Sequence, residues 1–97
     1  LPLASELRKT YDHIHIDTTA RPHMVCLYYV NNSDGDTYIF DKIYESGDGI
    51  FNDTIDPPIL KQVTPKKGRA VIFNGFRYHS GSLPTGDVRC VLNFNFV

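Results

Sequence analysis

Cysteine is scarce in this chain, because only Cys26 and Cys90 occur among its 97 residues. Two cysteines so far apart form neither a zinc-binding pattern nor the dense disulfide framework of small secreted domains. Their scarcity favours a reducing compartment, so we expect a cytoplasmic protein. The chain begins at Leu1 without a secretory leader, and we expect it to be an excerpt of a longer sequence.

A strong charge of one sign is also absent, since ten basic residues stand against eleven acidic ones for a net charge of −1. This balance gives no broad basic surface, and we therefore expect no nucleic-acid partner. The longest apolar run, residues 24–30, is far shorter than the ~20 residues that a membrane-spanning helix requires. No membrane partner is expected either.

Helical periodicity is missing as well, because no stretch keeps an apolar stripe over three turns. Instead, β-branched and aromatic residues gather in short runs between clusters of Gly, Pro, Asn and Asp, which is typical of an all-β domain. A single domain over residues 1–97 with so many short strands suits a sandwich or jelly roll. The predicted strands are residues 10–17, 23–30, 37–43, 59–63, 69–73, 76–80 and 88–97.

Two connections between the predicted strands carry expectations of their own. Residues 32–36 contain Asp34-Gly35, a pair that supplies positive φ in tight turns, so we predict a hairpin there. Residues 45–58 form the one long irregular connection, with three Asp, two Gly and a Pro-Pro pair. Long loops in compact domains are often functional, and this one is a candidate lid over the site.

The first predicted strand alternates polar and apolar side chains. His13, His15 and Asp17 would face one side of it, while Ile14 and Ile16 would face the other. Polar groups that alternate with Ile in this way indicate a lined cavity. A His-x-Asp pair by itself is weak, because it occurs by chance in many chains.

His79 adds a second imidazole to the His15 and Asp17 pair. Two imidazoles and one carboxylate are the ligand set that holds a non-haem Fe(II) on one face and leaves the opposite positions open for small molecules. Arg89, at the start of the last predicted strand, adds a permanently charged fork for a carboxylate. Together these residues indicate an oxygen-using metalloenzyme.

In these strand contexts, the order His, Asp, Tyr, His, Arg resembles the 2-oxoglutarate- and Fe(II)-dependent dioxygenases, nearest to their prolyl 4-hydroxylase-like branch. The resemblance covers the chain from about Tyr11 to its end. It implies a double-stranded β-helix, a cupin-like form of jelly roll, here without the N-terminal helices that relatives usually carry. The matching segments are His15-Ile16-Asp17, Cys26-Leu27-Tyr28-Tyr29-Val30-Asn31, Gly35-Asp36-Thr37, Thr64-Pro65-Lys66-Lys67-Gly68-Arg69, Ile72-Phe73, His79-Ser80-Gly81 and Gly86-Asp87-Val88-Arg89.

The same resemblance implies the roles of the site residues. Arg89 would hold the distal carboxylate of 2-oxoglutarate, Tyr29 would donate its hydroxyl to that group, and Thr37 would be a further contact. With O2 as the other cosubstrate, the implied activity is hydroxylation of an unactivated C–H bond in a small molecule or peptide, as 2-oxoglutarate is decarboxylated to succinate. Related halogenases lack the carboxylate ligand, so its presence favours hydroxylation. The implied iron ligands are His15, Asp17 and His79.

Other interpretations of the site stay open. His13 and His15 form a His-x-His spacing similar to that of cupins, but residues 18–21 lack the Glu that cupins add. A second alternative is a non-catalytic β-sandwich, metal-free or metal-binding, that serves in binding or assembly. A third is a degenerate dioxygenase-like fragment that keeps the ligands but lacks the N-terminal support needed for activity.

Two strands have apolar rows at their outward positions, and exposed patches of that size normally mark an interface. We predict that the rows lie on one sheet and are covered by a partner, such as a second copy in a homodimer, or by further sequence. The rows are Met24, Cys26, Tyr28 and Val30 in one strand, and Cys90, Leu92, Phe94 and Phe96 in the other.

Overall fold

The computed structural model describes residues 11–86 and 88–97, in which there are six β-strands and no helix. The prediction of an all-β protein is therefore confirmed. Nothing in this part of the chain is a helix long and apolar enough to cross a membrane. The strands are β1 (Met24–Tyr29), β2 (Thr37–Ile43), β3 (Ile59–Val63), β4 (Ala70–Asn74), β5 (Arg77–Gly81) and β6 (Val91–Phe96).

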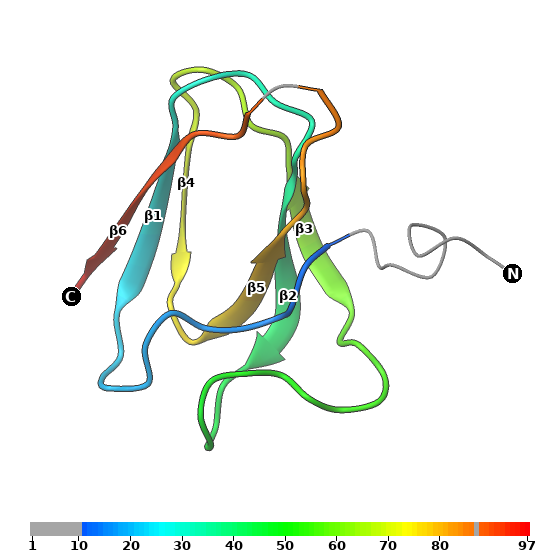
Figure 1. Ribbon diagram of the computed structural model, residues 1–97. Coiled ribbons are helices and arrows are strands. Elements are labelled where there is room, and N and C mark those ends of the chain that lie inside the picture. Colours follow the sequence, from blue (N-terminus) through cyan, green and yellow to red (C-terminus); the bar gives the residue numbers. More distant parts are fainter. Residues whose placement is uncertain (1–10, 87) are drawn as a thin grey trace, which may run out of the picture.

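The strands form two antiparallel sheets of three strands each, one in the order β4-β1-β6 and the other in the order β3-β2-β5. Figure 1 shows the two sheets facing each other as the layers of a sandwich. The chain crosses from one sheet to the other after β1, β3, β4 and β5, and only β2 and β3 follow each other within a sheet. Residues distant in sequence therefore meet between the layers.

The hairpin predicted at residues 32–36 is wrong, because β1 and β2 belong to different sheets. Gly35 also does not adopt the positive φ that we expected of it. A Cβ at this buried position would lie 2.7 Å from the carbonyl oxygen of Ser82 and 3.0 Å from Cδ of Arg89. Glycine is needed here because two other segments approach the backbone closely.

The strand predicted at residues 10–17 is not formed in its described part, residues 11–17, and Thr10 lies outside the described residues. Only His15 pairs, through isolated bridges to His79 on one side and Ile50 on the other. One pair on each side is too little for a continuous ladder. The predicted alternation still holds, since the side chains of residues 14 and 16 are buried and that of residue 13 is exposed.

Two clusters of buried side chains form the core. Alternate residues of a strand face opposite sides, so β2 contributes to both clusters and the β3-β2-β5 sheet is covered on both faces. Side chains of residues 11–16 cover much of the second face of this sheet. The first cluster is Val25, Leu27, Tyr29, Ile39, Val63 and Phe73, and the second is Ile14, Ile16, Tyr38, Phe40 and Tyr78.

The outward side of the β4-β1-β6 sheet carries an exposed apolar face. The prediction that the two apolar rows lie on one sheet is confirmed for β1 and β6, whose register sets them side by side. Phe94 lies in the middle of the β6 row, next to Cys26 of the central strand β1, and is 53% exposed. The paired residues are Met24 with Phe96, Cys26 with Phe94 and Tyr28 with Leu92.

Covering of this apolar face by a partner stays a prediction that Phe94 can test. We expect the protein to self-associate or to bind a hydrophobic dye, and Phe94→Asp to lower both because it places a charge on the face. Light scattering and dye fluorescence would measure this. Ile55→Asp is the matched control, since Ile55 is 81% exposed but lies on the 45–58 loop. A monodisperse wild-type monomer that binds no dye would contradict the prediction.

Candidate metal centre

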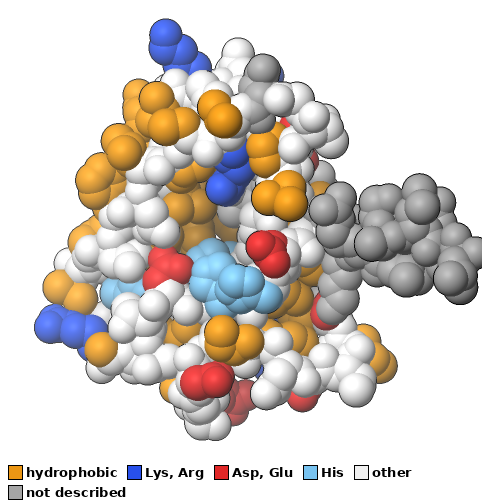
Figure 2. All heavy atoms as spheres, in the orientation of Figure 1, with side chains coloured by type: hydrophobic (Ala, Val, Ile, Leu, Met, Phe, Trp, Pro, Cys, Tyr) orange, Lys and Arg blue, Asp and Glu red, His pale blue; other side chains and the backbone are white. Residues whose placement is uncertain are grey.

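His15 and His79 are brought together by the backbone. The amide of each donates a hydrogen bond to the carbonyl of the other, at 3.0 Å and 2.9 Å, which places the two residues directly opposite each other. Their imidazole centroids lie 4.8 Å apart. The ligand atoms of His15, Asp17 and His79 all lie within 4.8 Å of one another, although Asp17 and His79 are 62 positions apart in sequence. Figure 2 shows His side chains gathered at the middle of one face, between acidic side chains.

Backbone carbonyls determine which nitrogen of each imidazole faces Asp17. Nδ1 of His15 lies 3.3 Å from the carbonyl oxygen of His13, and Nδ1 of His79 lies 3.1 Å from that of Arg77. A carbonyl only accepts, so each Nδ1 carries a hydrogen and each Nε2 keeps a lone pair for a metal. These Nε2 atoms lie 3.4 Å and 3.2 Å from Oδ1 of Asp17.

The converging atoms fit a divalent cation. With each Nδ1 protonated, three atoms that carry lone pairs point at one another, and either a second proton on a ring or a cation must lie between them. Ligands in adjacent octahedral positions around an ion at about 2.1 Å are about 3 Å apart, which is close to the 3.2 Å and 3.4 Å between Oδ1 of Asp17 and the two Nε2 atoms. The three ligand atoms together spread over up to 4.8 Å, so the imidazoles would draw closer around an ion. Two imidazoles and one carboxylate on one side of the ion are the donor set of non-haem Fe(II) sites.

The electrostatics of the cluster keep the carboxylate ionised. Hydrogen bonding to His15 first, and to His79 second, holds the pKa of Asp17 well below its usual range, against the opposing effect of burial. The pKa of His15 is raised in turn, chiefly by its hydrogen bond with Asp17. The two shifts agree in direction, as expected for a close pair of opposite charges. Asp17 is therefore ready to bind a cation at neutral pH.

These shifts predict how pH changes the stability of the metal-free protein. The raised pKa of His15 adds stability that is fully present below its ordinary value of 6.5 and is lost as the pH rises through the raised value. The lowered pKa of Asp17 adds stability that is present above its ordinary value of 3.8 and is lost as the pH falls toward the lowered value. We expect the melting temperature of chelator-treated protein to fall by a few degrees as the pH rises above neutrality.

Thermal denaturation from pH 5 to pH 9 in the presence of a chelator would measure this effect. Asp17→Asn should flatten the profile, because the uncharged amide no longer stabilises the charged imidazole of His15. His13→Ala should leave it nearly unchanged, since the His13 side chain is 61% exposed and the hydrogen bond to His15 comes from the backbone carbonyl of His13, although the two rings lie 4.8 Å apart. The prediction fails if Asp17→Asn and wild type show the same pH profile.

Arg89 provides a positive charge on the same side of the sandwich as the cluster, and its described contacts are with neutral groups. Its Nε donates to the carbonyl oxygen of Gly35 and its Nη2 donates to Oγ1 of Thr37, each at 2.8 Å. Both acceptors are neutral, and no carboxylate in residues 11–86 and 88–97 forms an ion pair with this guanidinium. Placing a charge in a half-buried position without a counter-ion is unfavourable, so the arrangement favours an anionic ligand.

Tyr29 and Thr37 complete the polar group around Arg89. The Tyr29 hydroxyl donates to Oγ1 of Thr37 at 2.6 Å, and the two residues are 0% and 1% exposed. Burial raises the pKa of the Tyr29 phenol, while hydrogen bonding to Thr37 and the nearby Arg89 charge oppose that rise. The phenol is protonated at neutral pH and can donate to an anion. All three residues expected to contact the cosubstrate therefore lie together.

Gly81 shows how far the Arg89 group lies from the metal cluster. A Cβ on Gly81 would come within 3.4 Å of Cζ of Arg89. Gly81 follows His79 by two residues in β5, so both face the same side of the sheet and are separated by about 6.6 Å. The strand positions that carry the metal ligand His79 and face the guanidinium are thus about as far apart as the ends of a short dicarboxylate. Figure 2 shows a basic side chain in a hollow next to the His group.

Sequence reasoning missed Asn93, whose Nδ2 donates to Oδ2 of Asp17 at 3.1 Å. The available signal was strand parity, because residues 89, 91, 93 and 95 share one face of the last strand. Conversely, His13 does not join the cluster, although its ring lies 4.8 Å from that of His15. The His-x-His spacing therefore supplies one ligand candidate and not two.

Two loops border the site. The candidate lid, residues 45–58, runs beside the His15 segment, where Gly49 accepts a 2.9 Å hydrogen bond from the amide of Ile16 and Phe51 donates one of 2.9 Å to Ile14. Gly49 has a φ of 86°, a backbone conformation that favours glycine. That this loop closes over the site stays a prediction. Because it lies beside the metal cluster, it is placed where it could contact a substrate.

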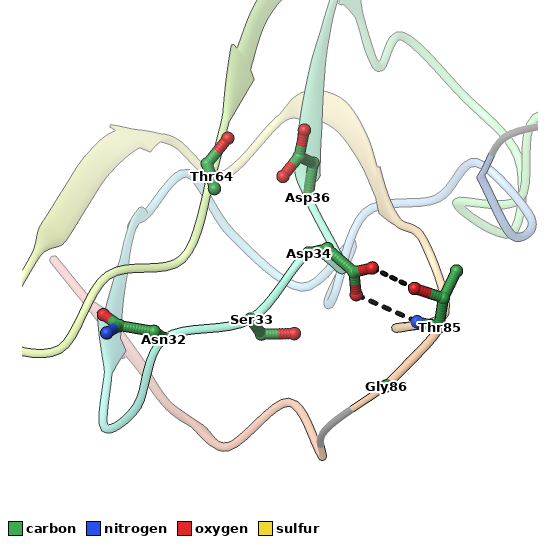
Figure 3. A pocket seen from close by; sticks show the side chains of 7 residues that line it. All are labelled: Asn32, Ser33, Asp34, Asp36, Thr64, Thr85 and Gly86. Atoms are coloured by element: carbon green, nitrogen blue, oxygen red, sulfur yellow. Dashed lines mark hydrogen bonds between the residues drawn. The ribbon is translucent and has the colours of Figure 1, made fainter.

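The other loop, between β1 and β2, encloses a polar hollow of about 540 Å³ with the connection between β5 and β6 (Figure 3). Asp34 accepts hydrogen bonds from the amide and the hydroxyl of Thr85, and so ties the two connections together. The same loop supplies the Gly35 carbonyl that Arg89 contacts. These hydrogen bonds fix the position of the loop whose Gly35 carbonyl contacts Arg89.

No family model, curated protein or solved structure matches the chain. The fold and the site define it as an antiparallel β-sandwich with a His-Asp-His cluster that can hold a metal.

Proposed function

We propose that the chain is the core of a 2-oxoglutarate- and Fe(II)-dependent dioxygenase that hydroxylates an unactivated C–H bond. The observation that best supports this is the spacing between the His15, Asp17 and His79 cluster and Arg89, which forms no ion pair within residues 11–86 and 88–97. Such a cluster suits Fe(II) and leaves positions open for small molecules. The fork of Arg89 suits the far carboxylate of a dicarboxylic acid bound at those positions.

The strand order supports a double-stranded β-helix as the finer description of the fold. The chain crosses repeatedly between the two sheets, as it must in a jelly roll. His15 bridges to the edge strand β5, so the segment before β1 extends the β3-β2-β5 sheet. In this arrangement one edge of the sandwich carries all three candidate ligands.

The side chains would divide the work as follows. A bound Fe(II) with 2-oxoglutarate and O2 supplies the oxidising chemistry, in which 2-oxoglutarate loses CO2 to give succinate and the substrate gains a hydroxyl group. Arg89 would bind the distal carboxylate bidentately, and the Tyr29 hydroxyl would turn from Thr37 to donate to the same group. Leu27 and Ile39 are buried and lie opposite Asn93 and His79, so they would exclude water beside the cosubstrate.

The test is to load purified protein anaerobically with Fe(II), add 2-oxoglutarate and O2, and measure O2 uptake and succinate release. We expect slow 2-oxoglutarate-dependent succinate formation that a true substrate accelerates, so peptides, amino acids and nucleobases would be screened. Calorimetry of 2-oxoglutarate binding to the Mn(II)-loaded protein would report binding without turnover. Failure of the protein to bind either the metal or 2-oxoglutarate would contradict the proposal.

The second candidate is a non-catalytic, metal-binding or metal-free β-sandwich that serves in binding or assembly. The observation that favours it is the exposed apolar face of the β4-β1-β6 sheet, on which Phe94 is 53% exposed. Self-association of protein that holds a metal but binds no 2-oxoglutarate would select this candidate.

A further inference from the structure

The two oxygens of the Asp17 carboxylate lie in different surroundings. Oδ1 faces the Nε2 atoms of His15 and His79, at 3.4 Å and 3.2 Å. Oδ2 accepts a 3.1 Å hydrogen bond from Nδ2 of Asn93. A carboxylate only accepts, so the NH2 group of the amide faces it. One oxygen is thus directed at the metal position and the other is held by a strand of the opposite sheet.

The position of Asn93 follows from the register of β6. Asn93 pairs with Leu27 of β1, whose side chain is buried in the core, and Val91 on the same face packs against that core. Strand parity therefore turns Asn93 toward the sheet that carries His79, at an exposed position on the rim of the sandwich. The short, uncharged amide can bridge to Asp17 without adding a charge to the cluster.

We propose that Asn93 is a positioning residue that makes Asp17 bind the metal through Oδ1 alone. This inference rests on the proposed metal centre. A carboxylate with both oxygens free can rotate and chelate the ion, which would occupy a coordination position that the cosubstrate or O2 requires. With Oδ2 held by Asn93, that rotation breaks a hydrogen bond. Groups that support a metal ligand in this way commonly set both the affinity and the geometry of the site.

Asn93→Ala tests the inference, with Asn95→Ala as the matched control on the same strand. Metal affinity would be measured by chelator competition, and the absorption spectrum of the Co(II)-loaded protein would report the coordination geometry. We expect Asn93→Ala to weaken metal binding by about 10- to 100-fold and to change the Co(II) bands. Asn95→Ala should match wild type in both, and Asn93→Ser, which keeps a donor, should recover part of the affinity.

The outcomes separate this inference from the proposed function. If wild-type protein binds no metal, the metal centre itself fails. If wild type binds metal and a folded Asn93→Ala protein has the same affinity and the same Co(II) spectrum, the positioning role is overturned. Circular dichroism of the metal-free variants would establish folding. If Asn93→Ala does not fold, Asn93→Leu decides, because it keeps the size of the side chain and removes the donor. Wild-type Co(II) bands in Asn95→Ala with altered bands in Asn93→Leu support the role, and wild-type bands in both variants overturn it.

Discussion

Replacing His79 with alanine is expected to abolish metal binding and with it all 2-oxoglutarate-dependent turnover. His79 supplies one of three converging ligand atoms and is buried, so water cannot readily replace it. No other side chain in residues 11–86 and 88–97 places an imidazole at that position. The loss should exceed the roughly 10- to 100-fold that removal of a supporting residue costs. Elemental analysis of metal per chain and the rate of succinate release are the measurements.

His13→Ala is the control for this experiment, because it removes a neighbouring imidazole that lies outside the cluster. We expect it to keep the metal content and turnover of wild type. The same variant tests the cupin-like alternative, in which His13 would be a ligand. Loss of metal from His13→Ala and retention by His79→Ala would reverse the assignment of ligands made here.

The second large effect is expected for Arg89→Ala, which should weaken 2-oxoglutarate binding far more than metal binding. Truncating one partner of a buried charge pair costs roughly 2–5 kcal/mol, which corresponds to a roughly 30- to 5,000-fold rise in Kd. Because Arg89 is only half-buried, we expect the lower part of that range. Calorimetric titration of 2-oxoglutarate into the Mn(II)-loaded variant would measure it.

Two further variants sharpen the Arg89 experiment. Arg89→Lys keeps the charge but loses the planar fork, so it should bind 2-oxoglutarate more weakly than wild type and more tightly than the alanine variant. Arg21→Ala removes an exposed positive charge and should have no effect. Equal weakening by Arg89→Ala and Arg21→Ala would mean that overall charge, and no specific pocket, governs binding.

Most strands could be predicted from the sequence because their apolar side chains alternate or form short runs between Gly, Pro and Asn. The six observed strands all lie within or nearly within predicted segments. The sequence does not show which sheet each strand joins, and for this reason its local pattern at Asp34-Gly35 predicts a hairpin that the fold does not contain. The need for glycine at residue 35 comes from contacts with Ser82 and Arg89. No local pattern around residue 35 contains that information.

Strand parity and the family resemblance together predict part of the candidate site. Parity placed the residue 15 and 17 side chains on one face and Val25, Leu27 and Tyr29 on another, and both expectations agree with the observed burial. Parity also gives the face of Asn93, but its contact with Asp17 could not be predicted in this way. Its bond to Asp17 depends on how far the β6 edge approaches the His15 segment, a distance set by the packing of two sheets and not by either segment alone.

The single backbone bridge between His15 and His79 has a consequence for the metal-free state. A bound ion would hold the leading segment, residues 11–17, to the β5 edge through the ligand side chains, in addition to that backbone bridge. When the ion leaves, this segment keeps that bridge, the hydrogen bonds of Asp12 with Gly81 and Ser80, and the buried side chains of Ile14 and Ile16. It loses the link that the ion makes between the ligand side chains, and its amides should exchange with solvent sooner than those of β2 or β5. Under the proposed function, a lack of iron would then expose the leading segment to proteases before the rest of the sandwich unfolds.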